Sequence, residues 1–364
     1  MPLSLCLPGR WIPQAHQFPI HRSVRAPDFW YRPAAGVVAL LRSIALAPLA
    51  ALYDLGGCIR FALAKPFTAS VPVICVGNVT AGGTGKTPFA ITLAHGLKAL
   101  GHRPHIVTRG YGGSLRGPAQ VDCGHHTASE VGDEPLLLAE AAPTWIAKDR
   151  RAGVERAVAA GADMIVMDDG LQNPSVAKTV SLVLVDGETG LGNGRVIPAG
   201  PLRESPFRCF ARADALIIMG SESVCTHTQI APWQGPVYHA HLEPNAIRVA
   251  PQPYIAFAGI ARPDKFFATL DRLGVWLIDC VAFPDHHAFA EGEIERLVSR
   301  AKANNARLIT TAKDAVRLKP DQRAQIEVLP VVATIASREA FGRFLIEQLA
   351  SKQSLIEKSA HRVR

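Results

Sequence analysis

Short runs of hydrophobic residues recur along the chain, separated by segments in which apolar and polar positions alternate with helical spacing. Runs of this kind stand at residues 73–76, 105–108, 144–147, 164–167, 180–186 and 215–219. Continuous apolar runs rich in Val and Ile are typical of strands buried on both faces. Their alternation with helical segments predicts an α/β fold with a doubly wound, mostly parallel sheet, which binds ligands at the carboxyl ends of its strands.

A second series of strands and helices begins near residue 254. Before it, residues 237–242 and 246–249 flank a Glu-Pro-Asn turn and predict a β-hairpin, and the prolines that follow mark a boundary. These features divide the chain into parts. We expect a larger core at 67–236, a hairpin linker at 237–253, a second and smaller α/β domain at 254–349, and a tail that frays at 350–364.

The N-terminal part of the chain has a different pattern. Residues 1–25 show no periodicity and predict a disordered extension. Three adjacent aromatic residues at 29–31 precede an apolar stretch at 34–52 that contains one arginine and one proline. The arginine and the proline count against a clean bilayer crossing. The aromatic girdle and the arginines around it instead favour a membrane-associated helical segment within 26–66, lying on or dipping into the surface. The alternative is a buried core helix.

Composition narrows the choice of partners. The chain has 364 residues and a formal net charge of +8, which suits an anionic partner such as nucleic acid, an acidic membrane or a phosphorylated substrate. The sequence has no arginine-rich tract interleaved with aromatic residues, so we expect no nucleic-acid partner. Its seven cysteines lack the spacing of a zinc site or of a disulfide framework, and no cleavable signal peptide is visible. We therefore expect a reducing, cytosolic environment.

The glycine-rich segment TAGGTGKT at residues 80–87 connects the first buried strand to a helical pattern. Strand, glycine-rich turn, Lys-Thr and helix in this order are the context of a phosphate-binding P-loop. Backbone N–H groups at the helix N-terminus face the phosphates of a nucleoside triphosphate, Lys86 reaches the β and γ oxygens, and Thr87 holds Mg²⁺. The usual motif begins with glycine, whereas Thr80 stands there in this chain. The predicted nucleotide contacts are Thr80, Ala81, Gly82, Gly83, Thr84, Gly85, Lys86 and Thr87.

Two adjacent carboxylates follow another buried strand. Residues 164–167 are apolar and run directly into Asp168 and Asp169. A P-loop fold places its Mg²⁺-binding carboxylate at the carboxyl end of such a strand. We expect Asp169 to lie closer to the metal with Asp168 supporting it, and Gln172 to help position the site.

Several motifs occur in a fixed order between about residue 26 and about residue 349: APDFWY, VGNVTAGGTGKTP, TRGYGG, VGDEP, DDGLQ, PAGPLRE, FPDHHAF and TTAKDAVRL. In these motifs and in their order, the chain resembles the tetraacyldisaccharide 4′-kinases, the lipid A 4′-kinases of Gram-negative bacteria. Thr80 at the first P-loop position is also a feature of that family.

The resemblance implies an enzyme that transfers the γ-phosphate of ATP, with Mg²⁺, to the 4′-hydroxyl of a tetraacylated glucosamine disaccharide 1-phosphate. It implies a peripheral or monotopic protein at the cytoplasmic face of the bacterial inner membrane. An anionic lipid substrate and an acidic membrane surface both agree with the basic net charge. The sequence leaves the oligomeric state open, and a monomer is compatible with it.

The resemblance also implies roles for individual residues. Asp133 corresponds to the family's catalytic aspartate and His286 to the histidine that works with it, while Lys86 contacts the transferred phosphate. Asp285 orients the His286 ring or contacts the metal region. His287 is an equally good base by its chemistry, and only the alignment of motifs favours His286. Because the two catalytic residues fall in different predicted domains, we expect the active site in a cleft that closes on the substrate.

Further residues lie near the expected substrate side. Arg109 and Tyr111 follow the carboxyl end of a strand, and Arg203 and Glu204 follow a Pro-Ala-Gly-Pro turn. Contact with the lipid's phosphate or sugar and an ordinary turn stabilised by local hydrogen bonds are both compatible with these positions. The predicted substrate residues are Arg109, Tyr111, Gln172, Arg203 and Glu204. Lys313 and Asp314 are expected to begin a helix, without a catalytic role.

Two other classes of P-loop protein are alternatives to the kinase. A membrane-surface ATPase that acts as a nucleotide switch carries a signature lysine early in the loop, where this chain has Ala81. A nucleotide-dependent transporter subunit carries an LSGGQ-like stretch, which the sequence lacks. Either class would hydrolyse ATP without a lipid acceptor, so an acceptor assay separates them from a kinase.

Overall fold

The computed structural model describes residues 27–31, 37–245 and 250–361. Within these ranges the chain forms two compact units. The larger unit comprises residues 27–245 and 331–361, and the smaller unit comprises residues 250–330. The predicted extension at 1–25 and the second arm of the predicted hairpin, at 246–249, lie outside the described residues.

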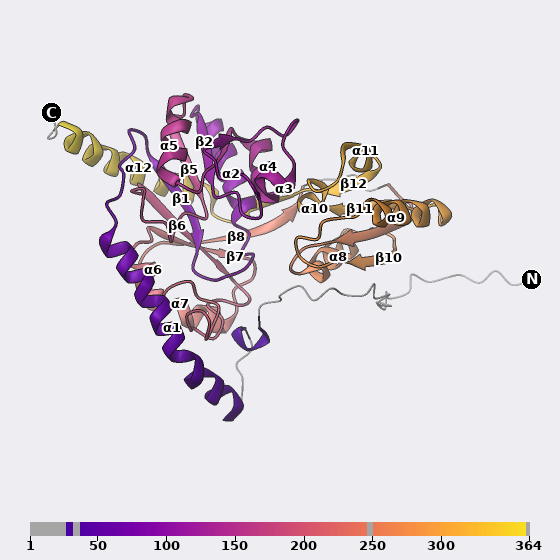
Figure 1. Ribbon diagram of the computed structural model, residues 1–364, viewed down its shortest axis with the longest axis horizontal. Helices are drawn as coiled ribbons and strands as arrows, with labels where there is room; N and C mark the ends of the chain where they lie inside the picture. The colour runs from indigo at the N-terminus through magenta and orange to yellow at the C-terminus, as the bar shows by residue number, and fades with distance from the viewer. Residues whose placement is uncertain (1–26, 32–36, 246–249, 362–364) are drawn as a thin grey trace, which may run out of the picture. The chain divides into compact units, whose positions relative to one another are not determined.

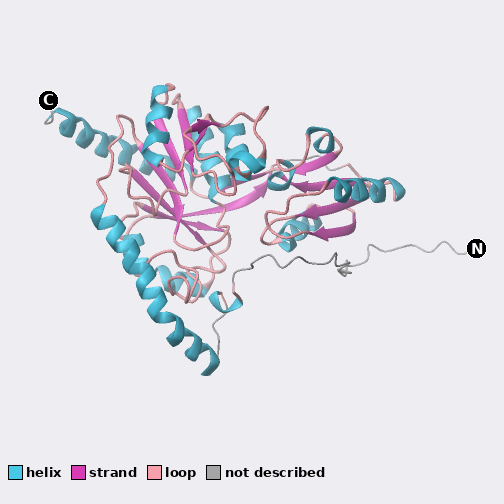
Figure 2. Cartoon of the chain, in the orientation of Figure 1, coloured by secondary structure: helices cyan, strands magenta, loops and turns pink. Residues whose placement is uncertain are grey.

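A nine-stranded sheet runs through the larger unit (Figure 2). Its strands are β1 Val73–Asn78, β2 Pro104–Thr108, β3 Ala119–Gln120, β4 Thr144–Ile146, β5 Met164–Asp168, β6 Val180–Asp186, β7 Ala215–Met219, β8 Val237–Pro244 and β13 Val331–Ile335. Their order across the sheet is β13-β8-β7-β6-β1-β5-β2-β4-β3. The strands from β8 to β4 are parallel to their neighbours, and β13 and β3 run antiparallel at the edges.

The helices of the larger unit cover both faces of this sheet (Figure 1). They are α1 Val37–Leu63, α2 Lys86–Ala99, α3 Ala128–Val131, α4 Asp133–Ala141, α5 Arg150–Ala159, α6 Pro206–Phe210, α7 Val224–Ile230 and α12 Arg338–His361, with a 3₁₀ turn at Asp28–Trp30. α2, α4 and α12 contribute to a core on one face, and α5, α6 and α7 contribute to cores on the other. The predicted doubly wound, mostly parallel sheet is confirmed.

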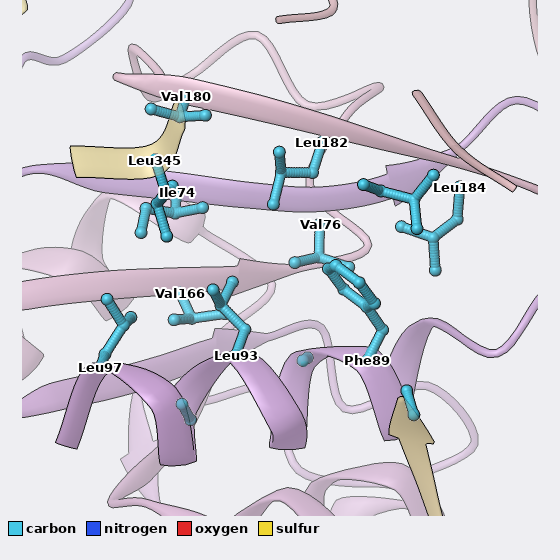
Figure 3. Close-up of a cluster of buried hydrophobic side chains, with 14 of the residues drawn as sticks. Ile74, Val76, Phe89, Leu93, Leu97, Val166, Val180, Leu182, Leu184 and Leu345 are labelled. Atoms are coloured by element: carbon cyan, nitrogen blue, oxygen red, sulfur yellow. The ribbon is translucent and has the colours of Figure 1, made fainter. Parts of the chain in front are cut away.

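Alternation along β1 explains why both faces are covered. Ile74 and Val76 belong to one hydrophobic cluster, and their neighbour Cys75 belongs to another, because successive side chains of a strand point to opposite faces. Figure 3 shows Phe89 and Leu93 of α2 packed toward this strand. The helix that follows the P-loop is therefore held directly over the central strand of the sheet.

Helix α1 is longer and more exposed than a core helix. The sequence pattern places its end at residue 52, but the helix continues to Leu63 and stops shortly before Pro66, a residue that disfavours helical geometry before it. The segment Ile44–Leu63 is long and apolar enough to cross a membrane by length and composition, and only 6% of it is buried. The alternative of a buried core helix is therefore wrong for the described part of α1.

The smaller unit is built around a separate four-stranded parallel sheet with the order β10-β9-β11-β12. Its elements are β9 Tyr254–Ala258, α8 Pro263–Arg272, β10 Leu277–Ala282, α9 Glu291–Ala303, β11 Arg307–Thr311, α10 Ala312–Ala315, α11 Pro320–Arg323 and β12 Ile326–Leu329. α9 packs on one face of the sheet and α8 on the other. Lys313 and Asp314 lie in α10, as the helix start expected there requires.

The chain returns to the larger unit after β12, which differs from the predicted smaller domain at 254–349. β13 pairs with β8 in antiparallel register, with Ala333 opposite Leu242, and so becomes the edge strand of the main sheet. Residues 237–242 are thus part of the main sheet rather than of a separate linker. Phe341 and Phe344 of α12 then join the main core. The predicted tail from residue 350 is helical as far as His361.

Candidate nucleotide-binding and catalytic site

The P-loop joins β1 to α2 at the carboxyl edge of the main sheet. Gly85 is the N-cap residue of α2 and has φ of 79°, a left-handed conformation that glycine adopts without strain. As a glycine, Gly85 offers no side-chain cap, so the N-cap position supplies no side-chain acceptor to the first backbone N–H groups of α2. A helix N-terminus of this kind attracts phosphate through its unpaired N–H groups and its dipole.

Lys86, the first residue of α2, is held at the loop by two oxygens. Its Nζ donates a hydrogen bond to Asn78 Oδ1 at 3.0 Å and lies 3.7 Å from Asp169 Oδ1. Asn78 is fully buried and also donates from Nδ2 to the Thr80 carbonyl oxygen at 2.8 Å. One amide thus fixes both the P-loop backbone and the lysine. The Tyr31 hydroxyl donates a further hydrogen bond to the same loop, to the Ala81 carbonyl oxygen at 2.8 Å.

Asp168 is the last residue of β5, and Asp169 follows it in a different environment. Asp168 is 1% exposed and accepts a hydrogen bond from Thr108 Oγ1 at 3.2 Å, whereas its Oδ1 has no hydrogen-bond partner among the described residues. Burial raises the pKa of Asp168 to about 7, and the charges of Glu134 and Asp169 add to this effect. The charges of Lys86 and Arg203 outweigh burial at Asp169 and lower its pKa. The two adjacent carboxylates therefore have separated pKa values.

Arg203 points toward this carboxylate pair, and the neighbouring Glu204 is buried against other side chains. Arg203 Nη1 donates to both Asp169 oxygens, at 2.8 and 2.9 Å. Glu204 is 4% exposed, and its two oxygens accept hydrogen bonds from Gln172 Nε2 at 3.0 Å and from Arg212 Nη2 at 2.5 Å. A buried carboxylate with both oxygens engaged is poorly placed to contact a lipid directly, so its predicted role as a substrate contact has no support from this geometry.

The VGDEP and TRGYGG segments pack against each other beside the acid pair. Asp133 is the first residue of α4 and is 8% exposed. A Cβ atom at Gly132 would lie 2.3 Å from the Tyr111 carbonyl oxygen, so only glycine fits this close approach. Arg109 is exposed in the same turn, and the Tyr111 side chain is 68% exposed. The structure thus brings Asp133, Arg109 and Tyr111 to one neighbourhood, next to Glu134 and Asp168.

The smaller unit presents a second cluster around His286. This residue has φ of 58°, a conformation that a non-glycine side chain rarely adopts. Its Nε2 lies 3.2 Å from Lys313 Nζ and 3.9 Å from Asp285 Oδ1, and Lys313 Nζ lies 3.5 Å from the same Asp285 oxygen. His286, Asp285 and Lys313 thus form one charged group at the carboxyl ends of β10 and β11.

His287 is held in a different way. Its Nε2 lies 2.8 Å from Glu293 Oε2, and its ring stacks on Phe283 with 4.9 Å between centroids. Glu293 also accepts a hydrogen bond from the Ala290 N–H at the start of α9. His287 therefore serves the packing of the smaller unit, and the choice of His286 as the catalytic histidine stays a prediction.

The model of the tetraacyldisaccharide-1-P 4′-kinase family matches residues 42–350. The chain belongs to this family. It is 50% identical over 303 residues to a tetraacyldisaccharide 4′-kinase of Parvibaculum lavamentivorans, covering 81% of this chain and 87% of the relative. It is 45% identical over 332 residues to a tetraacyldisaccharide 4′-kinase of Rhodospirillum centenum, covering 90% of this chain and 98% of the relative.

A solved structure has the same fold. The crystal structure of LpxK from Aquifex aeolicus in complex with ATP matches with a TM-score of 0.67 and 26% sequence identity, over 85% of this chain and 99% of that chain. The resemblance stated from motifs is confirmed, and this member of the 4′-kinase family is a kinase.

Sequence reasoning did not assign several residues that the structure shows beside the predicted ones. In the larger unit, Asn78 precedes the glycine-rich segment within a motif that was quoted only as a pattern. In the smaller unit, Lys313 lies beside His286 but was given no catalytic role. Arg150 is 3% exposed and follows β4, and the charges of Asp169 and Asp168 act on its guanidinium. Burial lowers the pKa of Arg150 despite these carboxylates. Asn78 is a polar residue at the carboxyl end of a buried strand, and this position in the sequence could have identified it as a site residue.

Proposed function

We propose that the chain transfers the γ-phosphate of ATP to the 4′-hydroxyl of a tetraacylated glucosamine disaccharide 1-phosphate, a lipid A precursor. Family membership supports the substrate class. The observation that carries the proposal is the group of Lys86, Arg203 and Asp169 beside the uncapped N-terminus of α2. Phosphoryl transfer depends mainly on positioning and on neutralising charge, and this group supplies two cations where the triphosphate is expected.

The residues at this site also fit a magnesium ion. Mg²⁺ takes oxygen ligands, commonly one or two carboxylates together with phosphates. Asp168 Oδ1 and Thr84 Oγ1 are buried oxygens without a hydrogen-bond partner among the described residues, a costly state that an ion or a phosphate would relieve. We assign the ion to Thr87, Asp168 and Asp169. When bound, it neutralises phosphate charge, while the P-loop residues 80–87 hold the triphosphate.

We assign removal of the acceptor proton to Asp133 and His286. Asp133 is nearly buried at the N-terminus of α4, in the same unit as the P-loop. His286 is 40% exposed, and its Nε2 lies 3.9 Å from Asp285 Oδ1 and 3.2 Å from Lys313 Nζ. Histidine is a common acceptor for a hydroxyl proton in enzymes that work near neutral pH. Asp285 orients the ring in this scheme.

We assign α1 to the membrane and Arg109 and Tyr111 to the lipid substrate. Leu52, Leu55, Ile59 and Leu63 form an apolar stripe at helical spacing and are 50–78% exposed. An exposed apolar stripe of this kind fits a helix that lies in a bilayer surface, which for this family's reaction is the cytoplasmic face of the inner membrane. Arg109 is exposed close to Asp133 and carries a charge that suits a sugar phosphate.

The test is ATP-dependent phosphorylation of a detergent-solubilised tetraacyl disaccharide 1-phosphate. Wild type is compared with Lys86→Ala, with Asp133→Ala and with Arg195→Ala, a control at an exposed arginine. We expect product with wild type and with Arg195→Ala, and a loss of at least about a hundredfold with the other two variants. ATP hydrolysis by wild type without lipid phosphorylation would overturn the kinase proposal in favour of a membrane-surface ATPase.

A further inference from the structure

Two consecutive residues of α1 connect to Gln172 by separate routes. Arg60 Nη2 donates a hydrogen bond to the Gln172 carbonyl oxygen at 3.0 Å. The next residue, Phe61, presents its ring to the Arg212 guanidinium, with Cζ 4.3 Å from the ring centroid. Arg212 in turn donates to Glu204 Oε2 at 2.5 Å, and Glu204 Oε1 accepts a hydrogen bond from the Gln172 side chain. Both routes end on the same residue.

Gln172 continues this chain of contacts to the P-loop. Its Nε2 donates to the Asn78 carbonyl oxygen at 3.0 Å as well as to Glu204. The Asn78 side chain accepts from Lys86 Nζ at 3.0 Å and donates to the Thr80 carbonyl oxygen. A continuous series of hydrogen bonds and one cation–π contact therefore runs from the membrane-facing helix to the lysine of the nucleotide site.

The segment between α1 and the acid pair is fastened at both ends. Asp54 of α1 forms an ion pair with Arg208 and accepts from the Ser205 N–H at 3.2 Å. On the other side of the same segment, Arg203 binds Asp169. Residues 203–212 thus lie between helix α1 and the site, and Figure 1 shows α6 next to α1. A displacement of α1 would therefore move this segment and the Arg203 side chain that binds Asp169.

Burial makes the Glu204 contacts specific rather than incidental. A carboxylate that is 4% exposed needs a cationic partner, because its charge is otherwise removed from water without compensation. Arg212 is the partner, and Phe61 limits the positions that its guanidinium adopts. With one Glu204 oxygen held by Arg212, the other has a defined direction, which selects the orientation of the Gln172 amide.

We propose that Arg212 and Glu204 are positioning residues of the nucleotide site, held in place by Phe61 of α1. They act through Gln172 and Asn78 on Lys86 and on the loop backbone, and they touch neither substrate. The inference rests on the proposed nucleotide site. It adds a second task for α1: besides its assignment to the membrane, the helix sets the geometry with which the P-loop receives ATP.

The test measures the affinity of the full chain for a fluorescent ATP analogue with Mg²⁺, together with the KM for ATP and kcat. Phe61→Leu keeps an apolar side chain but removes the aromatic face, Phe61→Tyr restores it, and Arg212→Gln removes the charge. The matched control is Leu41→Ala, which truncates an exposed leucine of the same helix outside its apolar stripe. Melting temperatures are recorded for all variants.

We expect Phe61→Leu to bind the analogue about two- to fivefold more weakly, and Phe61→Tyr and Leu41→Ala to bind it as wild type does. We expect Arg212→Gln to weaken binding by about tenfold or more, with a larger effect on KM for ATP than on kcat. The double variant Phe61→Leu/Arg212→Gln should bind the analogue as weakly as Arg212→Gln alone does, because both changes interrupt the same series of contacts.

Nucleotide affinity equal to wild type in both Phe61→Leu and Arg212→Gln would overturn the inference, whatever their melting temperatures. Such a result would leave the two residues with a structural role only. A wild-type chain that fails to bind the analogue would instead contradict the proposed nucleotide site itself, so the two failures are distinguishable.

Discussion

Arg203 holds both carboxylate oxygens of Asp169 from a single nitrogen, at 2.8 and 2.9 Å. Burial alone would raise the pKa of Asp169, but the charges of Lys86 and Arg203 outweigh it and keep this pKa below its usual value. Asp169 is therefore ionised at neutral pH, while the adjacent Asp168 has a pKa of about 7. Neighbouring acids with separated pKa values are typical of sites that bind ions or perform chemistry.

The Arg203–Asp169 pair predicts a loss of activity when the guanidinium is removed. Arg203→Ala leaves Lys86 as the nearest cation of Asp169 and withdraws positive charge from the expected phosphate position. We expect kcat/KM for the 4′-kinase reaction to fall at least about a hundredfold, because cations near a transferring phosphoryl group contribute several kcal/mol. Steady-state kinetics of Arg203→Ala, with Arg195→Ala as the control, measures this fall in kcat/KM. Equal losses in both variants would contradict a specific role.

The raised pKa of Asp168 predicts a pH-dependent penalty on stability. Between the unfolded value of 3.8 and the folded value of about 7, the folded chain holds a proton that the unfolded chain has lost. Stability therefore falls as the pH rises through this window. Asp168→Asn removes the penalty. We therefore expect the free energy of unfolding of the variant to rise relative to that of wild type between about pH 4 and about pH 7, by at most about 4 kcal/mol. Thermal denaturation without Mg²⁺ at pH 5 and pH 8 measures the difference. A difference in stability between variant and wild type that is the same at pH 5 and at pH 8 would refute this prediction.

The two adjacent histidines of the smaller unit predict opposite phenotypes. His287 stacks on Phe283 and binds Glu293, so His287→Ala should lower the free energy of unfolding by about 1–3 kcal/mol and change kcat little. His286→Ala should lower kcat by about 10²–10⁴-fold at nearly unchanged stability, because it removes the assigned proton acceptor. Kinetics and denaturant unfolding of both variants decide the matter. Large kcat loss in His287→Ala alone would reverse the assignment.

The apolar stripe on α1 predicts binding to anionic vesicles. Charging the stripe with Leu55→Asp and Ile59→Asp should reduce the bound fraction by at least about tenfold, because each exposed side chain contributes about 1.5–3 kcal/mol when it enters an apolar phase. Leu100→Asp is the control, since Leu100 is a similarly exposed leucine at the end of α2. Vesicle co-sedimentation provides the measurement. Undiminished sedimentation of the charged α1 variant would remove this helix from the membrane contact.

Local pattern was sufficient for the parts of the site that lie at strand ends. The segment at 80–87 and the pair Asp168–Asp169 follow buried strands, and the parallel sheet brings their carboxyl ends to one edge. The roles of Arg203 and Glu204 were not predictable in this way. Arg203 reaches Asp169 across a separation of 34 residues, a contact that depends on how the connecting loop packs.

The sequence by itself determined the α/β class, the P-loop and its acids, because hydrophobic periodicity and glycine-rich turns encode local backbone geometry. Tertiary structure alone decided which charges surround Asp169, that α1 extends to Leu63 with its apolar side chains exposed, and that β13 returns to the main sheet. These features come from strand pairing and side-chain packing between distant segments. Periodicity carries no information about which distant partner a strand or a charge will find.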